Sequence, residues 1–344
     1  MSKKKINVAV IGATGFTGLD LTFLLSKHPN VNIINLCATK NLGKKIHFFD
    51  QRIKKKLLKI TSINKINWKK LDLVFLSLPN GEAQKIIKKV YHEYKNLKFI
   101  DLSADFRIHN PKDYFKWYNK KHFSINNIKN SIYSISEFIK KDIKKYKIIS
   151  CPGCYPTSIQ LPLIPLLRQK LIKYDNITID SKSGYSGAGK SYLKRFTHKN
   201  FYNSIYAYST FQHRHMSELD QEFLKVTNKK VEYSFNPHLL PTFRGLLSSI
   251  YLELRQGITV NKILNTLNKE HKNNSFVKVL KLNQEIGTGN VLNTNNCEIS
   301  VCKTNQPNKI VIFSAIDNLI KGASGQAVQN MNLLYGLNEG IGLK

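Results

Sequence analysis

The chain has 344 residues, of which 42% are hydrophobic, with five cysteines and a formal net charge of +32. This length predicts two globular domains. The unevenly spaced cysteines argue against a disulfide scaffold, and no apolar run approaches the ~20 residues of a membrane span. We therefore expect a cytoplasmic protein. The lysines are spread along the whole chain and no zinc-finger or RNA-recognition motif accompanies them, which argues against a nucleic-acid-binding protein.

The first predicted element is a buried strand over residues 6–11, which leads into a glycine-rich turn and an apolar helix over residues 19–25. The turn reads Gly12-Ala-Thr-Gly15-Phe-Thr-Gly18. A strand, a glycine turn and a helix in this order open a dinucleotide-binding (Rossmann-type) domain, because glycines let the backbone approach a pyrophosphate at the helix N-terminus. We therefore expect cofactor contacts at Gly12, Thr14, Gly15, Phe16, Thr17 and Gly18.

A second predicted strand, over residues 32–37, ends in Ala38-Thr39-Lys40. NAD enzymes usually carry an acidic residue here for the ribose hydroxyls, and this chain has none. A hydroxyl from Thr39 and an ammonium group from Lys40 suit the 2′-phosphate of NADP instead, although an incidental solvated loop is the alternative.

Two further strands are predicted over residues 71–76 and 99–102. Ligands bind at the carboxyl ends of strands in an open parallel sheet, and these ends carry Pro79 and Arg107. We assign Pro79 to the cofactor. Arg107 is a candidate anion clamp, and the alternative is an arginine in a structural ion pair.

Cys154 lies in a segment that reads as a strand, a tight turn and a helix start, Ser150-Cys151-Pro152-Gly153-Cys154. A helix entrance favours the thiolate, so Cys154 is the candidate nucleophile. The spacing C-x-x-C is also compatible with a redox pair between Cys151 and Cys154, or with half of a zinc site.

After Cys154 the predicted strands become longer and cover residues 176–183, 232–236, 245–255 and 309–315. They predict a mixed or antiparallel sheet, and therefore an α+β second domain. Residues 318–334 are predicted to form a helix that returns to the first domain. The predicted domains are thus residues 1–150 with 318–344, and residues 151–317.

The segment from Gly184 to Ser191 matches the P-loop pattern G-x-x-x-x-G-K-S, and Asp317 is a candidate metal ligand for such a site. A P-loop triphosphatase is therefore an alternative. Against it, the segment follows a complete dinucleotide-type half, and residues 194–200 form a poor apolar helix. We expect the loop and Lys190 to bind some phosphate group.

His213 and His215 precede a predicted helix that Ser217 can cap. A helix N-terminus disfavours the imidazolium, which leaves a neutral imidazole available for proton exchange. Structural and metal-binding roles are the alternatives for both histidines. We expect Glu218 to orient the pair.

These motifs, with Asn236-Pro-His-Leu-Leu-Pro-Thr-Phe-Arg244-Gly and Asp317-Asn318-Leu-Ile-Lys321-Gly-Ala-Ser-Gly-Gln326, resemble the N-acetyl-gamma-glutamyl-phosphate reductase family of the semialdehyde dehydrogenases over nearly the whole chain. The resemblance implies NADP(H) as the cofactor and a homodimer or homotetramer. It also implies reduction of N-acetyl-L-glutamyl 5-phosphate to the 5-semialdehyde through a cysteine thioester, in arginine biosynthesis. Related enzymes acting on aspartate semialdehyde or carrier-bound aminoadipyl phosphate are the alternatives.

The same resemblance assigns roles to residues, and we expect no metal. Cys154 is the implied nucleophile, with His215, or less readily His213, as acid and base and Glu218 beside them. The sequence departs from the family pattern at Asp20, Lys190 and Ser217, and Pro162 is unexpected in a helix that already contains Pro165. Further cofactor contacts are expected at Ser186, Gly187 and Asn318, and substrate contacts at Arg107, Lys190 and Arg244.

Overall fold

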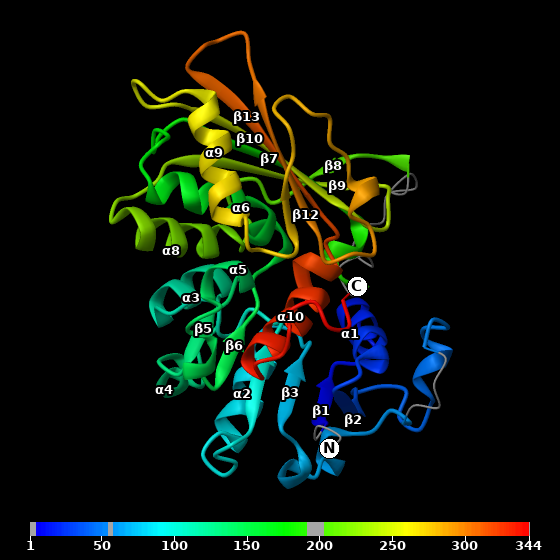
Figure 1. The fold of residues 1–344 in the computed structure, drawn as a ribbon. Helices are drawn as coiled ribbons and strands as arrows, with labels where there is room; N and C mark the ends of the chain where they lie inside the picture. The colour runs from blue at the N-terminus through cyan, green and yellow to red at the C-terminus, as the bar shows by residue number, and fades with distance from the viewer. Residues whose placement is uncertain (1–4, 54–57, 191–202, 344) are drawn as a thin grey trace. The chain divides into compact units, whose positions relative to one another are not determined.

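The computed structural model of the chain describes residues 5–53, 58–190 and 203–343. The chain forms two compact units (Figure 1). Unit 1 contains the residues up to Pro152 and those from Ala323 onward, and unit 2 runs from Gly153 to Gly322. The sequence placed these two boundaries after residues 150 and 317.

Unit 1 is built on a six-stranded sheet in which all pairings are parallel, in the order β2-β1-β3-β4-β6-β5. The strand order reverses between β1 and β3, which is where an open parallel sheet binds its ligand. The strands are mostly continuous apolar runs because helices cover both faces. They are β1 Ile6–Ile11, β2 Val31–Cys37, β3 Leu73–Leu76, β4 Lys98–Asp101, β5 Ser131–Tyr133 and β6 Ile148–Ser150.

Alternate residues of β1 enter two different cores, one on each face of the sheet. Val8 and Val10 join the core beneath α1 and α10, whereas Ala9 and Ile11 join the core beneath α2. The C-terminal helix α10 packs beside α1 in Figure 1, so the chain returns to this unit as predicted. The helix begins at residue 325 instead of 318, and a π-helical turn, Ile320–Ser324, precedes it. The helices are α1 Phe16–Lys27, α2 Glu82–Val90, α3 Pro111–Tyr118, α4 Ile125–Ile128, α5 Ser136–Ile139 and α10 Gly325–Leu334.

Unit 2 is built on a seven-stranded mixed sheet in the order β11-β12-β13-β10-β7-β9-β8. The pairs β7–β9 and β11–β12 are parallel and the other pairs are antiparallel. The predicted fold class, a Rossmann-type domain followed by an α+β domain with a mixed sheet, is confirmed. The strands are β7 Ile177–Gly184, β8 Tyr206–Ala207, β9 Tyr233–Leu240, β10 Leu246–Glu253, β11 Val277–Val279, β12 Cys297–Lys303 and β13 Lys309–Ile316.

Helices α6 (Cys154–Arg168), α8 (Met216–Thr227) and α9 (Val260–His271) lie on one face of this sheet, with α6 packed on β10 and β13 (Figure 1). Helix α6 continues through both Pro162 and Pro165. The hydroxyl of Ser158 in α6 bonds to that of Ser248 in β10 at 2.8 Å, which fixes the helix against the sheet through a buried polar contact.

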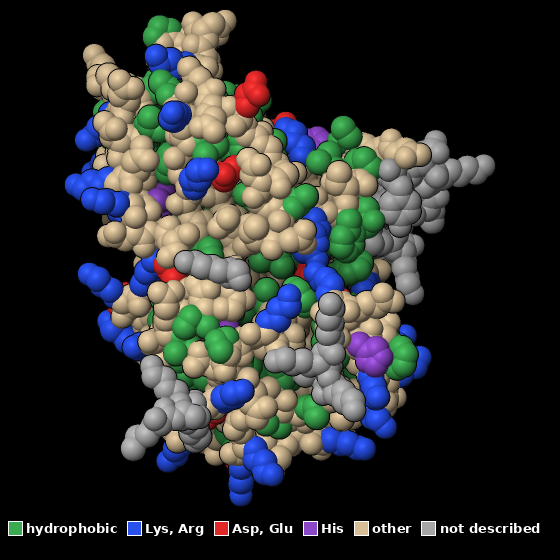
Figure 2. Space-filling model, turned by 45° about the vertical axis from the view of Figure 1, so that its right-hand side comes forward, with side chains coloured by type: hydrophobic (Ala, Val, Ile, Leu, Met, Phe, Trp, Pro, Cys, Tyr) green, Lys and Arg blue, Asp and Glu red, His purple; other side chains and the backbone are tan. Residues whose placement is uncertain are grey.

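Figure 2 shows lysines and arginines scattered over the visible face and separated by uncharged surface. Throughout the residues that the structure describes, no helix combines the length and the apolar character that a bilayer crossing requires.

Candidate active site

The predicted glycine turn joins β1 to α1. Gly12 has a φ of +90°, and a side chain there would overlap the carbonyl of Ser77, while one on Gly18 would overlap the carbonyl of Gly12. Gly15 is the N-cap of α1, whose first turn carries no acidic residue. The turn therefore leaves a helix N-terminus that a pyrophosphate can approach.

The end of β2 is bonded to this turn. The N–H groups of Gly12 and Ala13 both donate to the carbonyl of Cys37, at 2.8 and 3.0 Å. Thr39 and Lys40 follow directly and are exposed, and Pro79 is exposed in the turn after the neighbouring strand β3. The residues predicted to bind the cofactor in unit 1 thus come from adjacent strands at one end of the sheet.

Arg107 is buried in the loop after β4, where its side chain holds the backbone. Its Nε donates to the carbonyl of Cys151 at 2.8 Å and its Nη2 to that of Leu102 at 3.0 Å. The loop is held further by buried Asp101, which accepts the N–H groups of Ser103 and Phe106 and whose pKa is raised to about 7, chiefly by burial. The structure therefore shows a positioning role for Arg107, and the anion-binding role that the sequence suggested stays a prediction.

Cys151 and Cys154 have different surroundings. Cys151 is buried in unit 1 beside the amide of Asn330, at 3.6 Å, and burial raises the pKa of its thiol to about 12. Cys154 is the first residue of α6 in unit 2, is half-buried, and has Gly153 as the helix N-cap. No disulfide joins the two thiols. The contrast favours Cys154 as the nucleophile, because a strongly raised pKa keeps Cys151 protonated.

Two glycines allow other segments of unit 2 to lie against Cys154. A side chain on Gly153 would overlap the imidazole of His215, and a Cβ on Gly322 would lie 2.6 Å from the Cβ of Cys154. The imidazole of His215 and the π-helical turn 320–324 therefore both lie at the start of α6.

Glu218 connects the histidine segment to the start of α6. Its Oε2 accepts the N–H of Gly153 at 2.9 Å and its Oε1 lies 4.0 Å from Nε2 of His215. The prediction that Ser217 caps this helix was wrong: His215 is the N-cap residue, and the hydroxyl of Ser217 donates to the carbonyl of Arg214 at 2.6 Å.

The P-loop-like segment does not have P-loop geometry. In a P-loop the backbone N–H groups cradle phosphates. Here the N–H groups of Gly184, Tyr185 and Ser186 donate to the carbonyls of Gly245, Thr242 and Phe243, at 2.7, 2.9 and 3.2 Å. Burial lowers the pKa of Lys190. Ser191 and residues 194–200 lie outside the described residues.

Arg244 and Asp317 form an ion pair at 3.4 Å in unit 2. Asp317 is buried and also accepts the N–H groups of Asn293, Leu319 and Ile320, at 2.8, 2.8 and 3.0 Å. These contacts show a structural role for Asp317 in place of the metal-binding role considered above. Across residues 5–53, 58–190 and 203–343, no three His, Cys, Asp or Glu side chains are grouped as a metal site.

The three predicted cofactor residues of unit 2 lie together. The Nδ2 of Asn318 donates to Oγ of Ser186 at 2.9 Å, and Oδ1 of Asn318 accepts the N–H of Gly245 at the same distance. A Cβ on Gly187 would lie 3.4 Å from Nδ2 of Asn318. This arrangement connects the loop after β7 to the turn that carries Arg244.

Sequence reasoning missed Tyr155, which packs against both histidines. Its ring makes edge contacts with the rings of His213 and His215, at 5.4 and 5.9 Å between centroids, and its hydroxyl donates to the carbonyl of His238 at 3.0 Å. Adjacency to Cys154 was the only signal in the sequence. The ring contacts depend on pairings about sixty residues apart along the chain.

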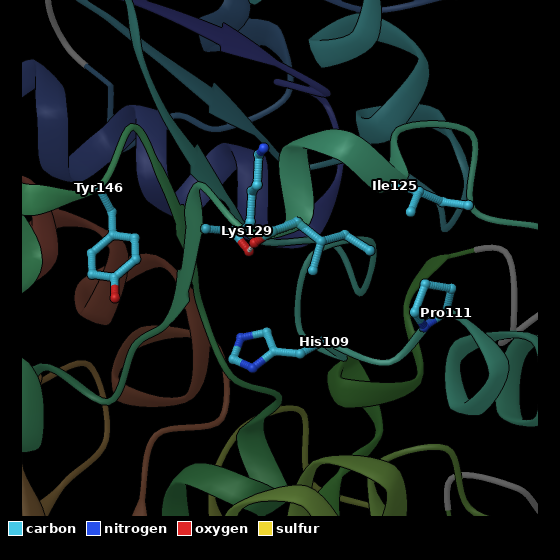
Figure 3. Close-up of a pocket in the computed structure, with 7 residues that line it drawn as sticks. His109, Pro111, Ile125, Lys129 and Tyr146 are labelled. Carbon is cyan, nitrogen blue, oxygen red and sulfur yellow. Dashed lines mark hydrogen bonds between the residues drawn. The ribbon is translucent and has the colours of Figure 1, made fainter.

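A separate hollow of about 450 Å³ lies in unit 1, at the amino ends of β5 and β6 (Figure 3). The ring of His109 points into it in Figure 3, and the wall includes Pro111, Ile125, Lys129 and Tyr146. It contains none of the residues predicted to bind substrate or cofactor, which follow the carboxyl ends of strands.

Comparisons with known proteins match two parts of the chain to domain models of one family. Residues 7–146 match the model of the semialdehyde dehydrogenase NAD binding domain, and residues 154–318 match that of the semialdehyde dehydrogenase dimerisation domain. Two solved structures share the fold: aspartate semialdehyde dehydrogenase II from Vibrio cholerae, complexed with ASA, and aspartate semialdehyde dehydrogenase with NADP from Candida albicans. Their TM-scores are 0.72 and 0.68, each at 17% identity, over 97% and 96% of this chain and 99% of each of those chains.

Relatives found by sequence are more similar to this chain than these two solved structures are. The N-acetyl-gamma-glutamyl-phosphate reductase of Afipia carboxidovorans is 41% identical over 100% of this chain and 98% of its own length. A probable chloroplastic N-acetyl-gamma-glutamyl-phosphate reductase of Arabidopsis thaliana is 39% identical over 99% of this chain and 84% of its own length. The chain therefore belongs to the semialdehyde dehydrogenase family and, within it, to the N-acetyl-gamma-glutamyl-phosphate reductases.

Proposed function

We propose that the protein reduces N-acetyl-L-glutamyl 5-phosphate with NADPH to N-acetyl-L-glutamate 5-semialdehyde and phosphate, a step of arginine biosynthesis. The observation that carries the proposal is the position of Cys154, which begins α6 with the imidazole of His215 and the carboxylate of Glu218 at the same helix start. The name of the relatives, at about 40% identity over the whole chain, supplies the substrate.

The chemistry of Cys154 follows from its position. His215 accepts the thiol proton, and Glu218 stabilises the resulting imidazolium. The thiolate attacks the acyl carbon, and the bond to the phosphate oxygen breaks. Phosphate departs, and the acyl group remains on Cys154 as a thioester. After reduction the imidazolium of His215 gives its proton to the oxygen of the reduced carbon, which forms the thiohemiacetal hydroxyl and leaves His215 neutral. The C–S bond of the thiohemiacetal then breaks, His215 takes up the hydroxyl proton, and the aldehyde leaves the Cys154 thiolate.

NADPH, when bound, would supply the hydride that reduces the thioester. The residues present fit it, because the glycine turn has no room for side chains at Gly12 and Gly18 and α1 presents an N-terminus without acidic residues. We assign the 2′-phosphate to Thr39 and Lys40, and the remaining contacts to Thr14, Gly15, Phe16, Thr17, Pro79, Ser186, Gly187 and Asn318.

Three cations are the candidates for the substrate's phosphate and carboxylate groups: Arg107, Lys190 and Arg244. Arg244 is mostly buried and is oriented by Asp317, so its guanidinium is held in place before substrate arrives. Lys190 follows Gly189, which has a φ of +79°, at the end of the loop that Asn318 connects to Gly245.

We also propose that the protein is a homodimer formed through the face of the unit 2 sheet opposite α6. On β7 and β9 this face carries half-buried polar residues, including Asp180, Lys182 and His238. Asp180 contacts both of the other residues: its Oδ1 lies 3.2 Å from Nδ1 of His238, and the Oδ2 of Asp180 lies 2.5 Å from Nζ of Lys182. The dimerisation-domain match over residues 154–318 supports self-association through this unit.

The reaction is tested in the reverse direction by phosphate-dependent reduction of NADP⁺. N-acetylglutamate semialdehyde should support the reaction, whereas aspartate semialdehyde should be at least ten-fold poorer in kcat/KM, since a missing set of amide contacts costs more than ~1.4 kcal/mol. Equal or better activity with aspartate semialdehyde would overturn the substrate assignment. Phosphate-independent activity would overturn the acyl-phosphate chemistry.

A further inference from the structure

The two histidines of the segment His213-Arg214-His215 have different environments. The ring of His213, a half-buried residue, lies among aromatic side chains, with edge contacts at 5.4 Å to Tyr155, 5.6 Å to Phe235 and 5.5 Å to Tyr208 between centroids. His215 instead lies over Gly153 at the start of α6. An imidazole held among aromatic rings and one beside the nucleophile suit different roles.

Hydrogen bonds determine where His213 carries its proton. Its Nδ1 accepts the backbone N–H of His215 at 3.2 Å. A backbone N–H can only donate, so Nδ1 must carry a lone pair and the neutral ring carries its proton on Nε2. Protonation of Nδ1 would place two N–H groups against each other, which opposes the cationic form.

The proton on Nε2 of His213 leads away from the nucleophile. Nε2 lies 3.4 Å from the hydroxyl of Tyr208, which donates in turn to the hydroxyl of Tyr155 at 3.4 Å. Tyr155 donates to the carbonyl of His238. This chain ends at an acceptor that cannot take up a proton, so it can orient His213 but cannot carry protons to or from Cys154.

The charges around His213 also favour its neutral form. Burial and, secondarily, the neighbouring charge of Arg214 lower the pKa of His213 to about 3. Burial raises the pKa of the neighbouring Tyr155 hydroxyl, so it carries no charge near pH 7. The carboxylate of Glu218 is directed to Gly153 and His215. Burial and hydrogen bonding therefore act in the same direction.

We propose that His213 is a positioning residue that takes no part in proton transfer: it fixes the peptide of His215, and so the imidazole of His215 over Gly153, through the bond between Nδ1 and the His215 N–H. This inference rests on the proposed function in that the orientation of His215 matters for thiolate formation at Cys154. It also decides which of the two histidines exchanges protons.

Two amide substitutions separate positioning from proton transfer. In His213→Asn the Oδ1 atom occupies the place of Nδ1 and can accept the same i+2 N–H, as in an Asx turn. In His213→Gln the amide lies at the place of Nε2, where it can reach Tyr208 but does not restore the bond to His215. Neither amide can exchange a proton near pH 7, so a proton-transfer role would be lost equally in both.

We expect His213→Asn to retain kcat within about five-fold of the unmodified protein and to preserve the pH profile of kcat. We expect His213→Gln to lose on the order of 10²-fold in kcat, with a smaller change in KM. The rate of iodoacetamide alkylation at Cys154 can be followed by peptide mapping at several pH values. We expect this rate to be close to that of the unmodified protein in His213→Asn and lower in His213→Gln. Equal loss in both variants, or a better Gln than Asn variant, would overturn the proposal.

Two further measurements cover the cases in which activity cannot decide. In the unmodified protein, ¹⁵N chemical shifts should show His213 as the neutral Nε2–H form throughout pH 5–9, and titration within this range would overturn the proposal even if the variants fail to fold. The alkylation and NMR readouts need no substrate. They therefore remain valid if the protein shows no activity with N-acetylglutamate semialdehyde, which would refute only the proposed function.

Discussion

The backbone N–H of Gly153 donates to Oε2 of Glu218 at 2.9 Å, which joins the N-cap of the helix that begins with Cys154 to the first turn of α8. Glu218 is fully buried, and its other oxygen faces Nε2 of His215 at 4.0 Å. The Glu218 carboxylate thus fixes the helix start that carries the Cys154 nucleophile. The same carboxylate lies beside the imidazole of His215, to which we assign the proton exchange.

Substitution of Glu218 should separate these two effects. Glu218→Gln can still accept the Gly153 N–H but removes the charge beside His215, so kcat should fall roughly ten- to a hundred-fold with little change in stability. Glu218→Ala should also lose about 1–3 kcal/mol of unfolding free energy, because it leaves the buried N–H unsatisfied. Glu222→Gln, one turn later on α8, is the matched control, and unchanged kcat in Glu218→Gln would contradict the assignment.

The space beside Cys154 should tolerate no methyl group at position 322. Gly322→Ala places a Cβ 2.6 Å from the Cβ of Cys154, which must displace the nucleophile or the π-helical turn. We expect a loss of about 1–3 kcal/mol in unfolding free energy and a large loss of kcat. Gly287→Ala is the control, since φ there is −146° and no atom lies within 4 Å of the added Cβ; equal effects at both positions would argue against close packing at Cys154.

Lys190 should distinguish phosphate binding from an incidental surface charge. Lys190→Ala should raise the KM for phosphate in the reverse reaction, and Lys190→Arg should restore or improve binding by offering two parallel donors. Lys281→Ala, at an exposed lysine elsewhere in unit 2, provides the comparison. A Lys190→Arg variant without activity, in a protein that binds magnesium-ATP at micromolar concentration, would instead support the triphosphatase alternative.

The exposed pair after β2 should set the cofactor preference. If Thr39 and Lys40 meet the 2′-phosphate, NADPH should bind more tightly than NADH by about 1–3 kcal/mol. The double variant Thr39→Ala, Lys40→Ala should narrow the difference between the two dissociation constants, measured at one moderate salt concentration. Equal affinities for the two cofactors in the unmodified protein would refute this role.

The features that sequence predicted well depend on local order along the chain. The strand, turn and helix around Gly12, and the helix that begins with Cys154, are each encoded within about twenty residues. The contacts that changed the interpretation are long-range. The P-loop pattern from Gly184 fails because carbonyls within residues 242–245 accept the first three of its N–H groups. Asp317 is bonded to Arg244 and to three backbone N–H groups.

Two local predictions also needed three-dimensional information. Ser217 has the side chain of a good N-cap, but a turn between His213 and Met216, closed by a 2.9 Å backbone hydrogen bond, makes His215 the cap instead. Pro162 and Pro165 would be expected to interrupt a helix. Helix α6 nevertheless continues through both, because it is buried along its length against β10, β13 and two neighbouring helices.

Cys154 is the residue that should carry the acyl group during the reaction. Cys154→Ser should lose at least ~10³-fold in activity while still binding NADPH, whereas Cys151→Ser should be much milder, because burial raises the pKa of Cys151 to about 12 and leaves it protonated. The most direct measurement is mass spectrometry of the protein mixed with N-acetylglutamyl phosphate in the absence of NADPH. We expect one N-acetylglutamyl group on the peptide that contains Cys154, retained in Cys151→Ser and absent in Cys154→Ser. An acyl group on another residue, or equal and complete loss of activity in both variants, would contradict it.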